Sequence, residues 1–89
     1  MTVSRPIIER ARAQALFVSH LQPCDLPTVE QVWATIRRVI AEQGVRGCQA
    51  LVAQEFGEHP DAAVARMRWA RETARRAYAP VPSPQLVAA

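Results

Sequence analysis

Residues 28–44 carry a complete set of signals for one amphipathic helix. Thr28 and Gln31 form a capping box, in which each side chain accepts a hydrogen bond from the backbone N–H of the other residue. Helical spacing of apolar residues then continues to Gly44, a residue type that ends helices in the left-handed conformation. The sequence therefore predicts a helix over residues 29–43, with an inward face of Val29, Val32, Trp33, Ile36, Val39 and Ile40.

Prolines and glycines divide the rest of the chain into further helical segments. Ser4 and Pro6 suit a helix start, and a two-proline linker follows that helix. Pro60, capped by His59 or Glu58, suits the start of the last helix, which later prolines must stop. We therefore expect an all-α single domain over residues 1–79, with four helices at about 5–20, 29–43, 46–56 and 60–79, followed by an extended, mobile, Pro-rich tail over 80–89. The capped second helix should form the core, with the long fourth helix across it.

Charge is concentrated at the C-terminal end of the chain. All eleven basic residues are Arg, which we attribute to a coding bias such as that of a GC-rich genome rather than to function. Residues 1–60 carry six Arg and six acids, whereas residues 61–89 carry five Arg against Asp61 and Glu72 and so supply the net charge of +3. An electrostatic partner is therefore expected at the last helix.

Steps of 100° per residue divide the last helix into three arcs. A stripe made mostly of alanine forms the core face, and Trp69, flanked by Arg66 and Arg76, is expected roughly opposite it. Either the N-terminal helix, the tail or a cation–π contact with Arg66 covers the indole, or Trp69 is an exposed anchor for a protein partner. The predicted partner-binding residues are Trp69, Arg66 and Arg76, and the core stripe is Ala63, Met67, Ala70, Ala74, Ala77 and Tyr78.

Residues 49–70 resemble a helix-turn-helix motif. Ala53 lies four residues before Gly57, as a small residue beneath a turn glycine does in that motif, and Val52 and Phe56 fit its apolar positions. Val64 and Met67 fit the apolar positions of its second helix if the turn is one residue longer than standard. Departures are Glu58, where the motif has a buried aliphatic residue, and the acids at the start of the second helix. The resemblance implies a DNA-binding regulator. Its phosphate contacts would be Arg68, Arg71 and Arg75, a ridge that otherwise is a solvated face or a dock for an acidic partner.

Catalytic and metal-binding patterns are not found. His20, Cys24, Cys48 and His59 count to a Cys2His2 set, but their spacing is not that of a zinc finger. A disulfide between the two cysteines is the other alternative to two unreactive thiols. We expect no enzyme activity, no metal and no cofactor.

The location and role are expectations of the same kind. No apolar run has the length that spans a bilayer, and charges interrupt the N-terminal segment where a signal peptide needs apolar residues, so we expect a soluble cytoplasmic protein. Residues 86–89 resemble the tails that bacterial unfolding proteases grip. The predicted function is a non-catalytic protein–protein interaction or self-association module acting through the last helix, with a protein partner or homodimer; the alternative is DNA binding. No membrane association and no small-molecule substrate are indicated.

Overall fold

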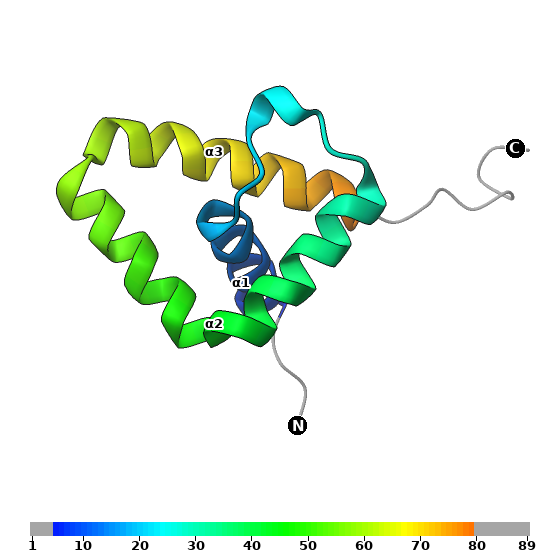
Figure 1. Ribbon diagram of the computed structural model, residues 1–89, viewed down its shortest axis with the longest axis horizontal. Helices are drawn as coiled ribbons and strands as arrows, with labels where there is room; N and C mark the ends of the chain where they lie inside the picture. Colours follow the sequence, from blue (N-terminus) through cyan, green and yellow to red (C-terminus); the bar gives the residue numbers. More distant parts are fainter. Residues whose placement is uncertain (1–4, 80–89) are drawn as a thin grey trace, which may run out of the picture.

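The computed structural model describes residues 5–79, and these form an all-α domain (Figure 1). Helix α1 spans Arg5–Val18, a short 3-10 turn η1 spans Pro23–Asp25, α2 spans Val29–Glu58 and α3 spans Pro60–Ala77. Within this part of the chain no residue is in a strand. The expected N-terminal cap at Ser4 and the tail over 80–89, with the protease-tail resemblance, lie outside the described residues.

Helix α2 begins as the capping box predicts. The Gln31 backbone N–H donates to Thr28 Oγ1 at 3.1 Å, and the Thr28 N–H donates to Gln31 Oε1 at 2.8 Å. Two N–H groups that the first helical turn leaves free are thereby satisfied. This part of the prediction is confirmed.

The expected helices over 29–43 and 46–56 are joined into α2, so residues 5–79 form three α-helices and the predicted count of four is not confirmed. Gly44 does interrupt the helical backbone, with φ +72° and ψ 164°. That backbone conformation is open almost only to glycine. The chain bends there and returns at once to helix, which gives α2 the elbow seen in Figure 1.

A single residue, His59, separates α2 from α3. Its N–H donates to the Glu55 carbonyl at 2.7 Å, and its own carbonyl accepts from Ala63 N–H at 2.8 Å, so it closes one helix and opens the next. Pro60 occupies the first turn of α3 as predicted. Of the two predicted cap residues, His59 is the N-cap of α3, although its side chain makes no capping hydrogen bond, and Glu58 is the last residue of α2.

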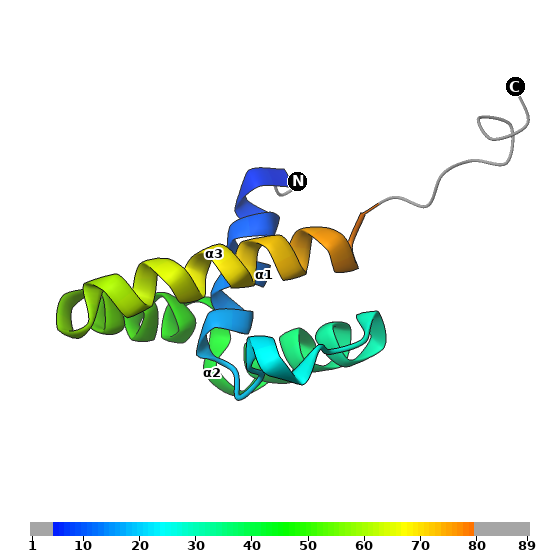
Figure 2. The ribbon, with the colours of Figure 1, turned by 90° about the horizontal axis from the view of Figure 1, so that it is seen from above.

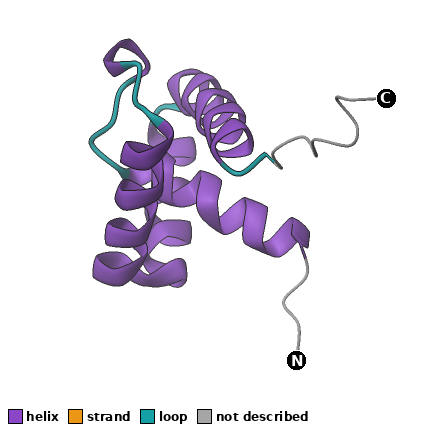
Figure 3. Ribbon diagram, turned by 90° about the vertical axis from the view of Figure 1, so that its right-hand side faces the viewer, coloured by secondary structure: helices purple, strands orange, loops and turns teal. Residues whose placement is uncertain are grey.

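Helix α1 occupies the centre of the domain. Figure 1 shows α1 nearly end-on, enclosed by the two halves of α2 and by α3. Figures 2 and 3 show that α1 crosses α2 and α3. Leu16 is fully buried, and Phe17 stacks on Phe56 of α2 with ring centroids 6.0 Å apart. Helix α1 therefore forms the centre of the core, where α2 was expected, and α2 packs around it. Helix α2 contributes the buried apolar residues Val32, Ile36, Val39, Cys48 and Val52.

The alanine stripe of α3 packs on this core as predicted. Ala63, Ala70, Ala74 and Ala77 are buried, and small side chains let the helix backbones approach closely. Met67 and Tyr78 flank the stripe and are partly buried against it. None of the helices within residues 5–79 has the length and apolar content needed to cross a bilayer.

Candidate functional site

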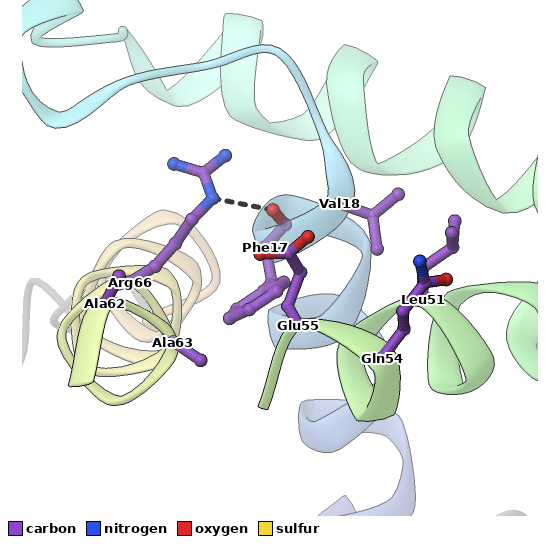
Figure 4. Close-up of a pocket in the computed structure, with 8 residues that line it drawn as sticks. All are labelled: Phe17, Val18, Leu51, Gln54, Glu55, Ala62, Ala63 and Arg66. Atoms are coloured by element: carbon purple, nitrogen blue, oxygen red, sulfur yellow. Dashed lines mark hydrogen bonds between the residues drawn. The ribbon is translucent and has the colours of Figure 1, made fainter. Parts of the chain in front are cut away.

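Arg66, one of the predicted partner-binding residues, binds the end of α1 within its own chain, and its role toward a partner stays a prediction. Its Nε–H donates to the Phe17 carbonyl at 2.7 Å (Figure 4), and Nη2 lies 2.9 Å from the carbonyls of both Ser19 and Leu21 and 3.3 Å from that of Leu16. These carbonyls belong to the last turn of α1 and the chain just after it, where helices leave acceptors free and carry partial negative charge. Burial lowers the pKa of the guanidinium, which nevertheless stays charged. Arg66 is therefore a structural clamp between α3 and α1.

Trp69 is half-buried, so the expected position opposite the core stripe is wrong. Its ring packs against the core, and the Arg66 guanidinium carbon lies 5.0 Å from the ring centroid. The physical reason is the helical period: Arg66 follows the buried Ala63 by three residues and precedes the buried Ala70 by four. That spacing places Arg66 at the edge of the core stripe and Trp69 beside it. Among the described residues the cation–π contact with Arg66 is present, while cover by the tail lies outside them and the role of Trp69 as a partner anchor stays a prediction.

The other arginines of α3 divide into two groups. Arg75 and Arg76 both form ion pairs with Glu72, whose pKa the two hydrogen-bonded guanidinium groups lower, Arg75 most. Arg76 is exposed and its Nε lies 3.2 Å from Glu72 Oε1. Arg68 and Arg71 are exposed and make no ion pair with any residue between 5 and 79. Only two of the three predicted phosphate-binding residues are thus unpaired.

The segment that resembles a helix-turn-helix packs differently from that motif. Val64, expected in an apolar position, is 48% exposed. Ala53 is exposed instead of lying beneath a turn, and Gly57 is inside α2 with a negative φ. Val52 and Phe56 do face the core as predicted. Residues 49–70 therefore form a helix–one-residue–helix corner in which the characteristic turn is missing.

The four candidate zinc ligands are not brought together. Cys48 is buried in the core, where burial raises the pKa of its thiol, whereas His20, Cys24 and His59 are exposed. No group of three or more His, Cys, Asp or Glu side chains within the described residues could hold a metal ion. Both cysteines are free thiols, so the proposed disulfide is not formed.

An apolar groove lies between α1, the first half of α2 and the end of α3. This groove has a volume of about 440 Å³. Several large apolar side chains in it are exposed, Ile7 by 55%, Val45 by 41% and Trp33 by 38%. The groove residues are Ile7, Ile8, Ala11, Arg12, Trp33, Ile36, Arg37, Ile40, Val45 and Tyr78.

Two aromatic residues fix one wall of the groove. Trp33 Nε1–H donates to the Ala77 carbonyl at 2.9 Å, which ties α2 to the C-terminal end of α3. The Tyr78 ring lies 6.1 Å from the Trp33 ring and carries the Arg12 guanidinium carbon 3.6 Å from its centroid. These contacts hold the indole in one orientation while part of its surface faces solvent.

A second opening of about 320 Å³ lies where the C-terminal end of α1 meets the second half of α2 and the start of α3. Figure 4 shows Arg66, Gln54 and Glu55 around it, so its lining mixes polar and charged groups with apolar ones. This opening offers less apolar surface than the groove. Its arginine, Arg66, is already bound to four carbonyls and is not free to bind a ligand.

The groove was missed in the sequence because Trp33 and Ile8 both lie on the apolar stripes of their helices. The stripes correctly predict which side of each helix faces the protein, but not whether a neighbouring helix covers it fully. Two adjacent isoleucines, Ile7 and Ile8, at the start of a short helix were the available signal, since one core-facing stripe cannot bury both equally.

Comparison with known proteins gives no further guide to this surface: no family model matches the chain, and searches of curated proteins and of solved structures found no match.

Proposed function

We propose that this protein is a non-catalytic interaction module that binds another polypeptide through the apolar groove. The observation that carries the proposal is the clustering of exposed Ile7, Trp33 and Val45 around one opening. Isolated exposed apolar residues are ordinary on protein surfaces, whereas a contiguous apolar patch rimmed by polar groups is typical of binding sites.

The residues of the groove support binding rather than chemistry. They offer aliphatic and aromatic side chains and two guanidinium groups, with no carboxylate, imidazole or thiol among them. Tryptophan, tyrosine and arginine are also the residue types that most often dominate the energy of protein interfaces. Tyr78 directly follows α3, so the C-terminal end of that helix borders the groove.

The groove is too open to favour a small molecule. Ligand pockets commonly enclose most of the surface of a bound small molecule. Here Ile7 and Val45 remain about half exposed, so a compact ligand would keep much of its surface in water. A polypeptide can cover the exposed side chains together.

DNA binding is the second candidate. It is favoured by Arg68 and Arg71, which are exposed and free of ion pairs among residues 5–79. Against it stand the ion-paired Arg75 and the exposed Val64, because the motif needs that position inside. If DNA binds, its affinity must fall steeply with salt and must fall further in an Arg68→Glu/Arg71→Glu variant.

Selection from a displayed library of random peptides tests the proposed surface. The baits are the parent chain, an Ile7→Glu/Val45→Glu variant that charges the groove, and a Val64→Glu variant that adds a charge at an equally exposed apolar position outside it. All three changes are on exposed helical positions, so circular dichroism should show the same helix content. Peptides selected on the parent should bind the Val64→Glu control equally and lose binding to the groove variant. Equal binding to all three would place the surface elsewhere.

A further inference from the structure

The charges beside the groove are all of one sign. Arg12 and Arg37 are the charged residues that line it, one from α1 and one from α2. Neither is in an ion pair with, or hydrogen-bonded to, any residue between 5 and 79. Arg12 is held over the Tyr78 ring, a contact that uses the face of its guanidinium group.

Two acids on the same helices pair within those helices, and the other acids of α2, Glu30, Glu55 and Glu58, do not line the groove. Glu9 of α1 pairs with Arg5 at 4.0 Å, and Glu42 of α2 pairs with Arg38 at 3.9 Å, each within its own helix. The two groove arginines are therefore left with free N–H donors at the edge of an apolar surface. A guanidinium group matches a carboxylate with two parallel hydrogen bonds.

On the basis of the proposed function, we infer that the occupant of the groove is an amphipathic helix with carboxylates beside its apolar stripe. The shape of the groove supports a helix. Its apolar side chains come from successive turns of two helices, with Ile8 and Ala11 on α1 and Trp33, Ile36 and Ile40 on α2. Such a surface accepts side chains spaced three and four residues apart on a partner helix.

The backbone of the domain also favours a helical partner. Apart from Tyr78, which directly follows α3, all groove residues are in helices, whose N–H and C=O groups are bonded internally. No strand edge exists in residues 5–79 to which an extended peptide could add. A helix, whose backbone groups are bonded internally, therefore suits this surface better than an extended peptide.

A second copy of the same face fits poorly. Two copies related by a twofold axis would present the same patch to each other, so neither Arg12 nor Arg37 would find a carboxylate among the groove residues of the other copy. Bringing unpaired like charges into an interface costs free energy, whereas carboxylates at the rim gain it.

The test uses the same displayed library, with random peptides of about five helical turns, roughly 18 residues. Baits are the parent chain, Arg12→Glu/Arg37→Glu, and the groove variant Ile7→Glu/Val45→Glu as background. Peptides enriched on the parent should show apolar residues at helical spacing flanked by Asp and Glu. By fluorescence anisotropy they should bind the charge-reversed bait at least about tenfold more weakly, and more weakly as salt rises. Replacing their acids by Lys should restore binding to the reversed bait only.

Each other outcome overturns the inference in a distinct way. Enriched groove-binding peptides without an excess of acids would leave the proposed function intact but refute the acidic partner. A parent dimer in light scattering that Ile7→Glu/Val45→Glu makes monomeric would identify the occupant as a second copy. Peptide binding that appears only after Leu86→Asp/Val87→Asp would identify it as the chain's own residues 80–89. No enrichment above the groove-variant background would refute both the inference and the proposed function.

Discussion

Replacing Arg66 by alanine should lower the free energy of unfolding by about 3 kcal/mol. Three N–H protons, one on Nε and two on Nη2, face four carbonyls of the α1 end. Hydrogen bonds to a charged group contribute about 1.5–3 kcal/mol each when isolated, or roughly 4.5–9 for three. The side chain is only partly buried, and its desolvation opposes the gain. We therefore expect about half of this sum, roughly 2–4.5 kcal/mol.

The assay is urea unfolding followed by circular dichroism. A domain of this size has roughly 4–12 kcal/mol of stability, so the change removes a large share of it. In thermal unfolding the midpoint should fall by roughly 12–24 °C, at about 4–8 °C per kcal/mol. Arg66→Lys keeps the charge without the planar fork and should recover part of the loss.

Arg76→Ala is the matched control, because Arg76 lies on the same helix and its ion pair with Glu72 is exposed. Exposed pairs contribute about 0–1 kcal/mol, so this variant should unfold close to the parent. If Arg66→Ala unfolds within about 0.5 kcal/mol of Arg76→Ala, with equal dependence on urea concentration, the clamp does not hold α1 against α3.

Four other substitutions and a labelling experiment test the fold itself. Gly44→Ala should lower the free energy of unfolding by about 1–3 kcal/mol in urea unfolding, because Gly44 has a positive φ. Gly57→Ala, at an open helical position, should raise it by up to about 1 kcal/mol. If both variants change the free energy of unfolding in the same direction, the bend at Gly44 is refuted. Thr28→Ala should cost about 1 kcal/mol in the same assay, and no loss would show that the capping box is unimportant for α2. A maleimide should label exposed Cys24 at once and Cys48 only on unfolding. Burial raises the pKa of the Cys48 thiol, so its contribution to stability is complete below about pH 9 and is lost as the pH rises through the folded-state pKa. In thermal melts at alkaline pH, the melting temperature of Cys48→Ala should therefore fall less with rising pH than that of the parent.

Local signals were enough to predict where helices begin and bend. Thr28, Gly44 and Pro60 act through hydrogen bonds and dihedral angles of their own neighbours, which the sequence contains. The predicted number of helices is not confirmed, because a positive φ at one glycine can either end a helix or bend it. The difference depends on whether packing against α1 favours immediate return to helix, and that is a tertiary effect.

The helical period predicts which residues of α3 are buried more accurately than the division of this helix into three arcs did. Arg66 lies within one helical turn of two buried alanines, so the period alone places it beside the core. The carbonyls that it binds come from residues 16–21, more than forty positions away, and no local pattern indicates them. The exposure of Trp33 was beyond the sequence for a similar reason, since it depends on how much of α2 the start of α1 leaves uncovered.

The two ends of α1 are supported unequally, and this links stability to the proposed binding. The C-terminal half carries the buried Leu16 and Phe17 and is bound by Arg66, whereas residues 5–10 are all exposed. An isolated helical end of this kind has little packing to hold it, so its amides should exchange readily in the free protein. A helix in the groove would contact Ile7 and Ile8 and so supply the missing packing. At a partner concentration of a hundred times the Kd, binding adds about 2.7 kcal/mol to the stability of the whole domain. Because the groove is built partly from this weakly held end, the added hydrogen-exchange protection should be greatest in the first turns of α1, the half of that helix that the fold leaves unsupported.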